Sequence, residues 1–318
     1  MRFTKERKVA YVLLLMTALI WGGALPVVKN SYEETTAFRF LFYRYIFAAI
    51  VAVPIIFYYF HRVKAKTKSV IIISLIELIG VTLNLALLYT GLSKTTSIEA
   101  TLITMAGPFI TIVGGIIFLK EKEERNEILG LIIALSGTLL ITLLPLFADQ
   151  IVEVEFSLEG NLMVLGHTLI NTIYFILAKK YYNGYPKFYA SGVSFIVGLI
   201  SFFIIAALEI GGVNELLSAT TNEIVKPPVF FAAAYMGVLG SVVALTFYIK
   251  GQEMIEISEA SIFGYLQPVI TIPLGVLWLN ENLNIFQIMG ITLIAGGVIV
   301  ASVRERRRRR KRRHRVIS

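Results

Sequence analysis

A stretch of 24 residues occurs twice in this chain, and this duplication constrains the fold more than any other feature. Residues 98–121 (IEATLITMAGPFITIVGGIIFLKE) align without a gap on residues 258–281 (SEASIFGYLQPVITIPLGVLWLNE), at an offset of 160 positions. Outside the stretch, four glycines recur at the same offset: Gly80 with Gly240, Gly91 with Gly251, Gly130 with Gly290, and Gly137 with Gly297. The sequence therefore predicts two structurally related halves.

Long apolar runs place this chain in a membrane. Of its 318 residues, 56% are hydrophobic, whereas soluble domains contain about 45–50%. A helix needs about 20 apolar residues to cross the hydrocarbon core. We expect an all-α membrane protein with ten transmembrane helices, at about 8–29, 36–60, 69–92, 96–119, 127–147, 159–182, 187–210, 228–250, 258–279 and 284–303. The N-terminus resembles a signal peptide, but its apolar run continues to Pro26 without a clear cleavage site, so we interpret it as the first span.

The connections between these spans predict their orientation. Residues 61–68, 120–127 and 179–187 are basic or mixed, whereas residues 30–37, 148–160 and 211–228 are poor in Lys and Arg. The positive-inside rule then places both termini in the cytoplasm of a multi-pass cell-membrane protein. Five spans per half give the two halves opposite orientations, which is an inverted repeat. The expected organisation is a first repeat (1–147), an extracytoplasmic loop (148–158), a second repeat (159–303) and a basic cytoplasmic tail (304–318).

Three prolines lie inside predicted spans: Pro26, Pro108 and Pro268. Proline removes a backbone hydrogen bond and kinks or loosens a helix. A matched pair of interrupted helices in two halves of a membrane protein indicates a transport site. The prolines could instead only bend the helices to fit the bundle. Near Pro26, Gly22 and Gly23 could make the first span flexible or simply permit close packing.

Two predicted spans carry polar residues in register. Span three contains Glu77, with Asn84 seven residues later on the same helical face. In span six, His167, Asn171 and Tyr174 follow a helical spacing that forms one polar stripe. Glu77 or His167 could carry a proton, and Glu77 could also meet a cationic substrate. Either residue could instead be hydrogen-bonded and serve only packing.

Charged residues in two other regions have simpler interpretations. Arg44, inside span two, is expected to pair within the bundle, because a cation in the bilayer is costly. Arg39, nearer the surface, is expected to extend to the outer headgroups. Glu99 and Glu259 lie where their helices begin and are expected to have a structural role there. Glu121 and Glu281 end the same helices, where a helix-stop or loop role is expected.

The net charge of +9 comes from the C-terminal segment 304–315, which contains ten basic residues and one acid. Such a cluster beside a last span favours anionic membrane lipid, so no nucleic-acid partner is expected. The chain contains no cysteine, which excludes thiolate metal sites. The sequence shows no phosphate-binding glycine loop and no HExxH motif. We therefore predict no cofactor, no metal site and no enzymatic activity.

Several of these motifs resemble one known family. WGG, Pro26 and Lys29 in span one, the R-Y-x-F-A pattern at Arg44, and the endings F-L-K-E and W-L-N-E resemble the EamA-type branch of the drug/metabolite transporter superfamily. The resemblance covers about residues 8–303. The commonest family ending is F-L-G-E, and this chain has Lys120 and Asn280 at the usual glycine.

The resemblance implies a ten-helix carrier of small organic solutes with a central cavity. Spans one, three, four, six, eight and nine would line it, and spans five and ten would lie outside as buttresses or as the face of a homodimer. The candidate pathway residues are then Trp21, Glu77, Asn84, His167, Asn171, Tyr174, Tyr265 and Gln267. The expected function is secondary transport of a small-molecule substrate by alternating access, with amino-acid export favoured. The alternative is a flippase of a lipid-linked substrate or a multidrug exporter.

Overall fold

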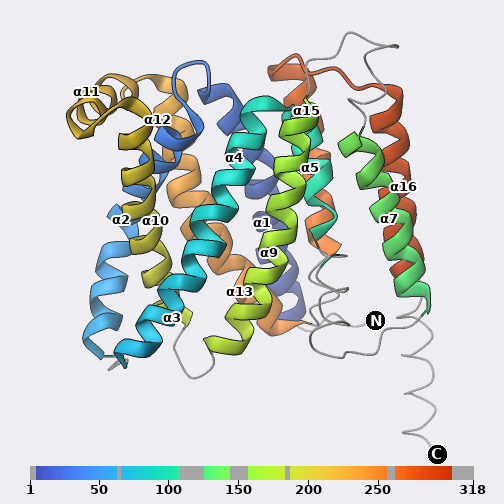
Figure 1. Cartoon of the computed structure of the whole chain (residues 1–318). Coiled ribbons are helices and arrows are strands. Elements are labelled where there is room, and N and C mark those ends of the chain that lie inside the picture. The colour runs from blue at the N-terminus through green and yellow to red at the C-terminus, as the bar shows by residue number, and fades with distance from the viewer. Residues whose placement is uncertain are drawn as a thin grey trace, which may run out of the picture.

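A computed structural model of the chain describes residues 5–62, 66–107, 110, 125–143, 157–182, 187–255 and 262–302, and every element within these ranges is helical (Figure 1). The first half contains α1 (Lys5–Ser31), α2 (Ala37–Arg62), α3 (Thr67–Glu77), η1 (Leu78–Leu83), α4 (Asn84–Lys94), α5 (Ser97–Thr104) and α7 (Arg125–Leu143). The second half contains α9 (Leu158–Tyr181), α10 (Lys187–Ile210), α11 (Val213–Glu223), α12 (Pro227–Ala234), η2 (Tyr235–Val243), α13 (Ala244–Met254), η3 (Ile262–Leu266), α15 (Gln267–Trp278) and α16 (Ile285–Ser302). Five of the described helices are long and apolar enough to cross a membrane, and three shorter apolar helices accompany them.

The two copies of the duplicated stretch run in opposite directions through the bundle. The start of α5 lies beside the end of α15, because the Ser97 amide donates to the Glu281 carboxylate across 2.6 Å. Both lie at the upper side of Figure 1. At the same side, Lys29 near the end of α1 donates to the carbonyl oxygens of Leu92 and Thr95 at 2.9 and 2.7 Å. The helices of the two halves therefore have the antiparallel relation of an inverted repeat.

Two spans contain a π-helical turn at equivalent positions. In span three, η1 covers Leu78–Leu83, and in span eight, η2 covers Tyr235–Val243. The repeat offset of 160 places the whole of η1 within η2. Neither turn contains a proline. Since π-turns occur frequently at functional sites, each half has a local distortion that the prolines did not predict.

The helix geometry differs from one of the predicted prolines to another. The helix α1 continues through Pro26 as one α-helix. Pro268 is buried in the first turn of α15, where the 3₁₀-helix η3 gives way to an α-helix. Pro108 lies outside the described residues.

The small residues of spans five and ten bring α7 and α16 into close contact with each other. A Cβ atom at Gly297 would lie 2.5 Å from the Gly130 carbonyl oxygen and 2.7 Å from the Ala134 amide nitrogen. A Cβ atom at Gly137 would lie 2.7 Å from the Gly290 carbonyl oxygen. Both helices lie at one edge of the bundle (Figure 1). These glycines therefore pack two helices within one chain.

We expect Gly297→Ala to destabilise the protein, because the added methyl group meets backbone atoms that cannot move independently. Overpacking of this kind costs about 1–3 kcal/mol. The matched control is Gly296→Ala, where a Cβ atom meets nothing within 4 Å. Thermal unfolding in detergent should show a lower midpoint for Gly297→Ala only. Equal midpoints for the two variants would contradict this packing role.

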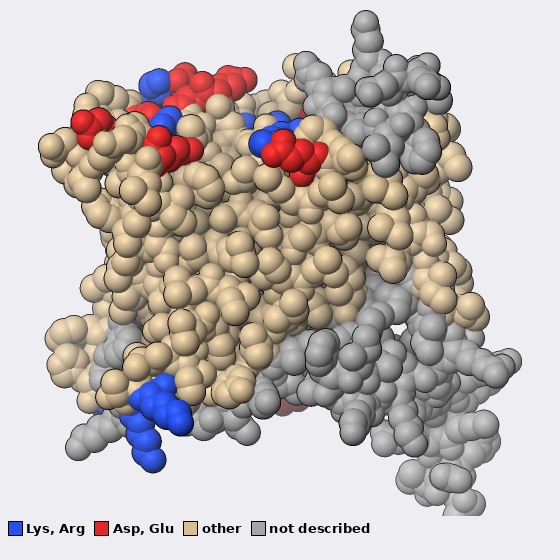
Figure 2. Space-filling view, viewed as in Figure 1, with Lys and Arg blue, Asp and Glu red and all other residues tan. Residues whose placement is uncertain are grey.

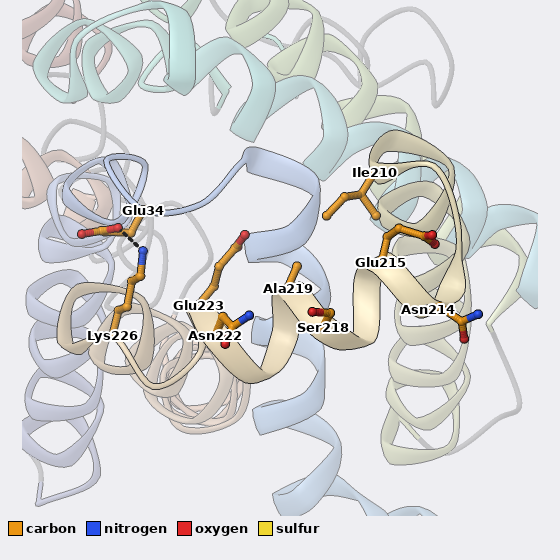
Figure 3. A pocket seen from close by; sticks show the side chains of 9 residues that line it. All are labelled: Glu34, Ile210, Asn214, Glu215, Ser218, Ala219, Asn222, Glu223 and Lys226. Carbon is orange, nitrogen blue, oxygen red and sulfur yellow. Dashed lines mark hydrogen bonds and ion pairs between the residues drawn. The ribbon is translucent and has the colours of Figure 1, made fainter.

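The connection after α10, residues 211–228, contains a helix that the sequence analysis did not predict. Gly211 has a φ of 98° and turns the chain, and α11 then runs from Val213 to Glu223 with Leu216 buried. A shallow surface groove lies along α11, and it is lined by Glu34, Ile210, Asn214, Glu215, Ser218, Ala219, Asn222, Glu223 and Lys226 (Figure 3).

The helix α11 also overturns the expectation for Arg39. The Arg39 Nε atom donates to Glu223 Oε2 at 3.1 Å, and the side chains of Thr35 and Tyr43 donate to the same oxygen at 2.6 and 3.1 Å. Arg39 therefore pairs within the protein instead of reaching lipid headgroups. The reason is that α11, which the sequence analysis did not predict, places a carboxylate beside the start of α2.

Charged side chains lie at the two ends of the visible face and leave an uncharged belt between them (Figure 2). The upper end carries acidic groups with a few basic partners, including the ion pairs Lys94–Glu159 and Lys226–Glu34. The lower end carries Arg62, Lys66 and Lys68, which are exposed. This distribution is typical of a protein that spans a bilayer.

Candidate functional site

Glu77 is completely buried between α3, α9 and α10. Its Oε1 atom accepts hydrogen bonds from the hydroxyl groups of Tyr182 at 2.5 Å and Tyr174 at 3.3 Å. Ser194 on α10 also lies close to this carboxyl group. No basic side chain in the described part of the chain forms an ion pair with Glu77. It is thus a carboxyl group held by neutral hydroxyl donors inside the bundle.

Gly80 allows Tyr174 to reach this carboxyl group. A Cβ atom at Gly80 would lie 1.9 Å from Cδ2 and 2.3 Å from Cε2 of the Tyr174 ring. The bare backbone of η1 therefore provides a notch into which the ring fits. The π-turn begins directly after Glu77 and carries this glycine.

Asn84 continues the polar contacts on the next turns. Its Nδ2 atom donates to Asn171 Oδ1 at 3.1 Å, and its backbone carbonyl oxygen lies 3.0 Å from His167 Nδ1. A carbonyl group only accepts, so Nδ1 carries a proton in this contact. Asn84 is buried, whereas His167 and Asn171 are half-buried. The structure therefore brings together five of the residues that the sequence analysis selected, along the interface between span three and α9.

Trp21 lies in a second group. Its Nε1 atom donates to the Gly240 carbonyl oxygen at 3.1 Å, and its ring centroid is 5.2 Å from that of Tyr248. One residue further along α1, a Cβ atom at Gly22 would lie 2.9 Å from the Gln267 carbonyl oxygen. Close packing of α1 on span nine is therefore one role of Gly22. Tyr265, on η3, is half-buried like Gln267.

Arg44 connects α4 with η2. Its Nη1 atom donates to the Tyr89 hydroxyl oxygen at 2.6 Å, and its Nε and Nη2 atoms donate to Ser241 Oγ at 3.2 and 3.0 Å. The guanidinium carbon also lies 5.5 Å from the centroid of the Tyr89 ring, which is cation–π distance. Within the described residues, its partners are neutral hydroxyl groups and aromatic rings instead of a carboxylate. Arg44, on α2, thus contacts span three of the first half through Tyr89 and span eight of the second half through Ser241.

Comparison with known proteins identifies the family. The sequence profile of the EamA-like transporter family matches residues 8–143 and again residues 158–303. The chain belongs to the EamA-like transporter family. The prediction of an all-α membrane protein built from two inverted five-helix repeats is thereby confirmed, since this family has a ten-helix inverted-repeat fold.

Several relatives of this EamA-like transporter match along nearly the whole chain. An uncharacterized transporter of Archaeoglobus fulgidus is 24% identical over 93% of this chain and 98% of its own length. The uncharacterized transporter YcxC of Bacillus subtilis is 26% identical over 92% of this chain and 93% of its own length. A WAT1-related protein of Arabidopsis thaliana is 27% identical over 80% of this chain and 73% of its own length. A protein crystal structure shows a similar fold. It superimposes with a TM-score of 0.56 at 17% identity, over 92% of this chain and 98% of its own chain.

The EamA-like transporter departs from the common family ending at Asn280, and the backbone explains the usual glycine. Asn280 has a φ of 54°. This left-handed conformation costs glycine nothing, and asparagine tolerates it better than most residues. The turn directs the Glu281 amide to the Gly275 carbonyl oxygen at 2.9 Å. Glu281 therefore points back toward α5, a contact that the expected helix-stop role did not include.

Glu99 is a second completely buried carboxylate. Its Oε2 atom accepts a hydrogen bond from Thr95 at 2.7 Å, and its Oε1 atom accepts one from Gln287 Nε2 at 3.1 Å. The backbone amide of Glu99 donates to Thr96 Oγ1, which caps α5. These contacts hold the upper ends of α5 and α16 together.

Sequence reasoning missed three residues of the site: Tyr182, Ser194 and Tyr89. Tyr182 was expected at the very end of span six (159–182), where the connection 179–187 overlaps it, and it lies directly after α9 in the structure. A tyrosine following two lysines at a helix end carries no distinctive signal. Glu121, Glu259 and the basic tail lie outside the described residues. Within the described ranges, no group of three or more His, Asp or Glu residues could hold a metal ion.

Proposed function

We propose that this EamA-like transporter is a secondary carrier that exports amino acids or related small metabolites across the cytoplasmic membrane by alternating access. The family and the printed descriptions of its relatives support membrane transport of a small-molecule substrate. The amino-acid class, the direction and the mechanism are our proposal.

The observation that carries the proposal is the polar column between span three and α9. It runs from Tyr182 and Glu77 through Tyr174 to Asn171, Asn84 and His167. Burying so many polar groups in a membrane protein is expensive unless they are paired or line a pathway. The column belongs to both halves, because α9 is the first helix of the second repeat. Movement of one repeat against the other would therefore change these contacts directly.

Each group then has a distinct task. The amide and imidazole groups of Asn84, Asn171 and His167 supply donors and acceptors for a polar solute. Trp21 and Tyr265 supply aromatic surface for its apolar part. Glu77 carries the coupling proton, since its partners are neutral hydroxyl groups that can serve either protonation state by donating or accepting.

The upper side of Figure 1 is assigned to the extracytoplasmic space. The exposed basic residues Arg62, Lys66 and Lys68 lie at the other end, and basic connections favour the cytoplasm. Both termini would then be cytoplasmic, where the tail 304–315 can bind anionic lipid. Lipid binding by the tail and formation of a homodimer are further expectations for this carrier.

Uptake into sealed vesicles containing the purified protein tests the proposal. Labelled amino acids should accumulate above the level of protein-free vesicles, and an imposed proton gradient should increase that accumulation. Flux that ignores the gradient would indicate a facilitator. Absence of flux for every amino acid would overturn the substrate class and favour a lipid-linked or drug-like substrate.

A further inference from the structure

The carboxylate of Glu281 binds the first turn of a helix from the other repeat. Its Oε1 atom accepts the Ser97 amide at 2.6 Å, and its Oε2 atom accepts the Ile98 amide at 3.0 Å and the Ser97 hydroxyl group at 2.9 Å. The first amides of a helix have no partner within the helix. Glu281 therefore supplies, from the second half, the acceptors that α5 of the first half lacks.

Two features of the second half hold Glu281 in this place. The left-handed Asn280 turns the chain back after α15. Gly275 then leaves room, because a Cβ atom there would lie 2.8 Å from Glu281 Oε2 and 2.8 Å from Ile98 Cγ1. The carboxylate is thus seated between a bare helix backbone and the start of α5.

Other contacts between the halves lie close to this one. Thr101 Oγ1, one turn deeper in α5, lies 3.3 Å from Thr271 Oγ1, and Thr271 donates to the Gly22 carbonyl oxygen at 2.5 Å. Thr101 and Thr271 are almost completely buried, with exposed fractions of 3% and 1%. Below the Glu281 contact, α1, α5 and α15 are therefore in direct contact, and the two threonines between them are closed to solvent.

We propose that the contact between Glu281 and the start of α5 is a latch that keeps the extracytoplasmic entrance closed. The inference rests on the proposed alternating access, in which the two repeats separate at one end at a time. The latch suits this task, because it is polar and Glu281 itself is half-buried, so water can reach the carboxylate and replace its hydrogen bonds when the helices part. Breaking it exposes Thr101 and Thr271.

Cysteine labelling tests the latch, and the chain offers a clean background because it contains no cysteine. Thr101→Cys would be introduced into the full-length protein in right-side-out vesicles and treated with a membrane-impermeant thiol reagent. Labelling should be slow with Glu281 present and faster by about tenfold or more with Glu281→Ala, because loss of the latch raises the outward-open population. Glu281→Gln, which keeps the shape and one carbonyl acceptor, should give an intermediate rate.

The control is Glu33→Ala, which removes an exposed carboxylate at the same end of the bundle. It should leave the labelling rate unchanged. Equal rates for Glu281 and Glu281→Ala in folded protein, or equal acceleration by Glu33→Ala, would overturn the latch. Size-exclusion profiles identify variants that fail to fold, and Glu281→Gln then carries the test. Labelling requires no substrate, so an absence of amino-acid flux would contradict the proposed function without deciding this question.

Discussion

Glu77→Gln is expected to remove the stimulation of transport by a proton gradient. Glutamine keeps the size of the side chain and an oxygen that can accept from Tyr182 and Tyr174, which lie 2.5 and 3.3 Å from Glu77 Oε1. It cannot gain or lose a proton in the physiological range. The fold should therefore persist while the coupling step is lost. We expect gradient-driven uptake to fall by about tenfold or more, which corresponds to at least ~1.4 kcal/mol in the driving equilibrium or barrier.

Glu99→Gln provides a matched control in the same chain. Glu99 is also completely buried and also has neutral partners, Thr95 and Gln287. It lies at the upper ends of α5 and α16, away from the polar column, so its replacement should leave gradient dependence intact. Uptake would be measured in vesicles at equal protein content, with and without the gradient. If the proton gradient still stimulates uptake fully in Glu77→Gln, Glu77 has only a packing role. If both variants lose this stimulation, the effect is not specific to Glu77, and buried carboxylates in general are needed.

The sequence predicted the fold well because its signals are long and repeated. The apolar runs and the gapless duplication around Pro108 and Pro268 are enough to predict ten spans in two related halves. The polar stripe of α9 was predictable for a similar reason, since His167, Asn171 and Tyr174 follow a regular helical spacing. Glu77 and Asn84 of span three contact this stripe in the structure, a pairing that the sequence analysis did not predict.

Features that depend on one local contact were not predictable. The π-turns η1 and η2 have no proline and no other marker in composition. No helix was predicted over α11, whose eleven residues are mostly polar and of which Leu216 is the buried one. As a result, the partner of Arg39 was missed. The role of Glu281 depends on the left-handed conformation of Asn280, which becomes visible only in the backbone.

Gly237→Ala is expected to destabilise the protein strongly, because the added methyl group would meet the neighbouring helix α2. A Cβ atom at Gly237 would lie 2.6 Å from the Arg44 carbonyl oxygen, 2.6 Å from Phe47 Cβ and 3.0 Å from the Ala48 amide nitrogen. Two of these are backbone atoms of α2, so the clash can be relieved only by moving η2 away from α2. We expect a cost at the upper end of about 1–3 kcal/mol.

The same movement would stretch the bonds between Arg44 and Ser241, which are 3.0 and 3.2 Å long. Gly166→Ala is the control, because a Cβ atom there meets only Leu87 Cδ1 at an ordinary distance of 3.6 Å. Thermal unfolding in detergent should show a clearly lower midpoint for Gly237→Ala than for Gly166→Ala. Similar midpoints would mean that α2 and η2 can separate at little cost.

Gly237 also explains why the second half has no buried carboxylate that corresponds to Glu77. The repeat offset of 160 places it opposite Glu77. At Glu77 the first half has room for a carboxyl group among the hydroxyl groups of Tyr174 and Tyr182, whereas at Gly237 the backbone of α2 occupies the corresponding space. A carboxylate at Gly237 would therefore collide with α2 before it could find a partner. One half therefore carries a buried carboxyl group at this position, and the other carries a close contact between helices.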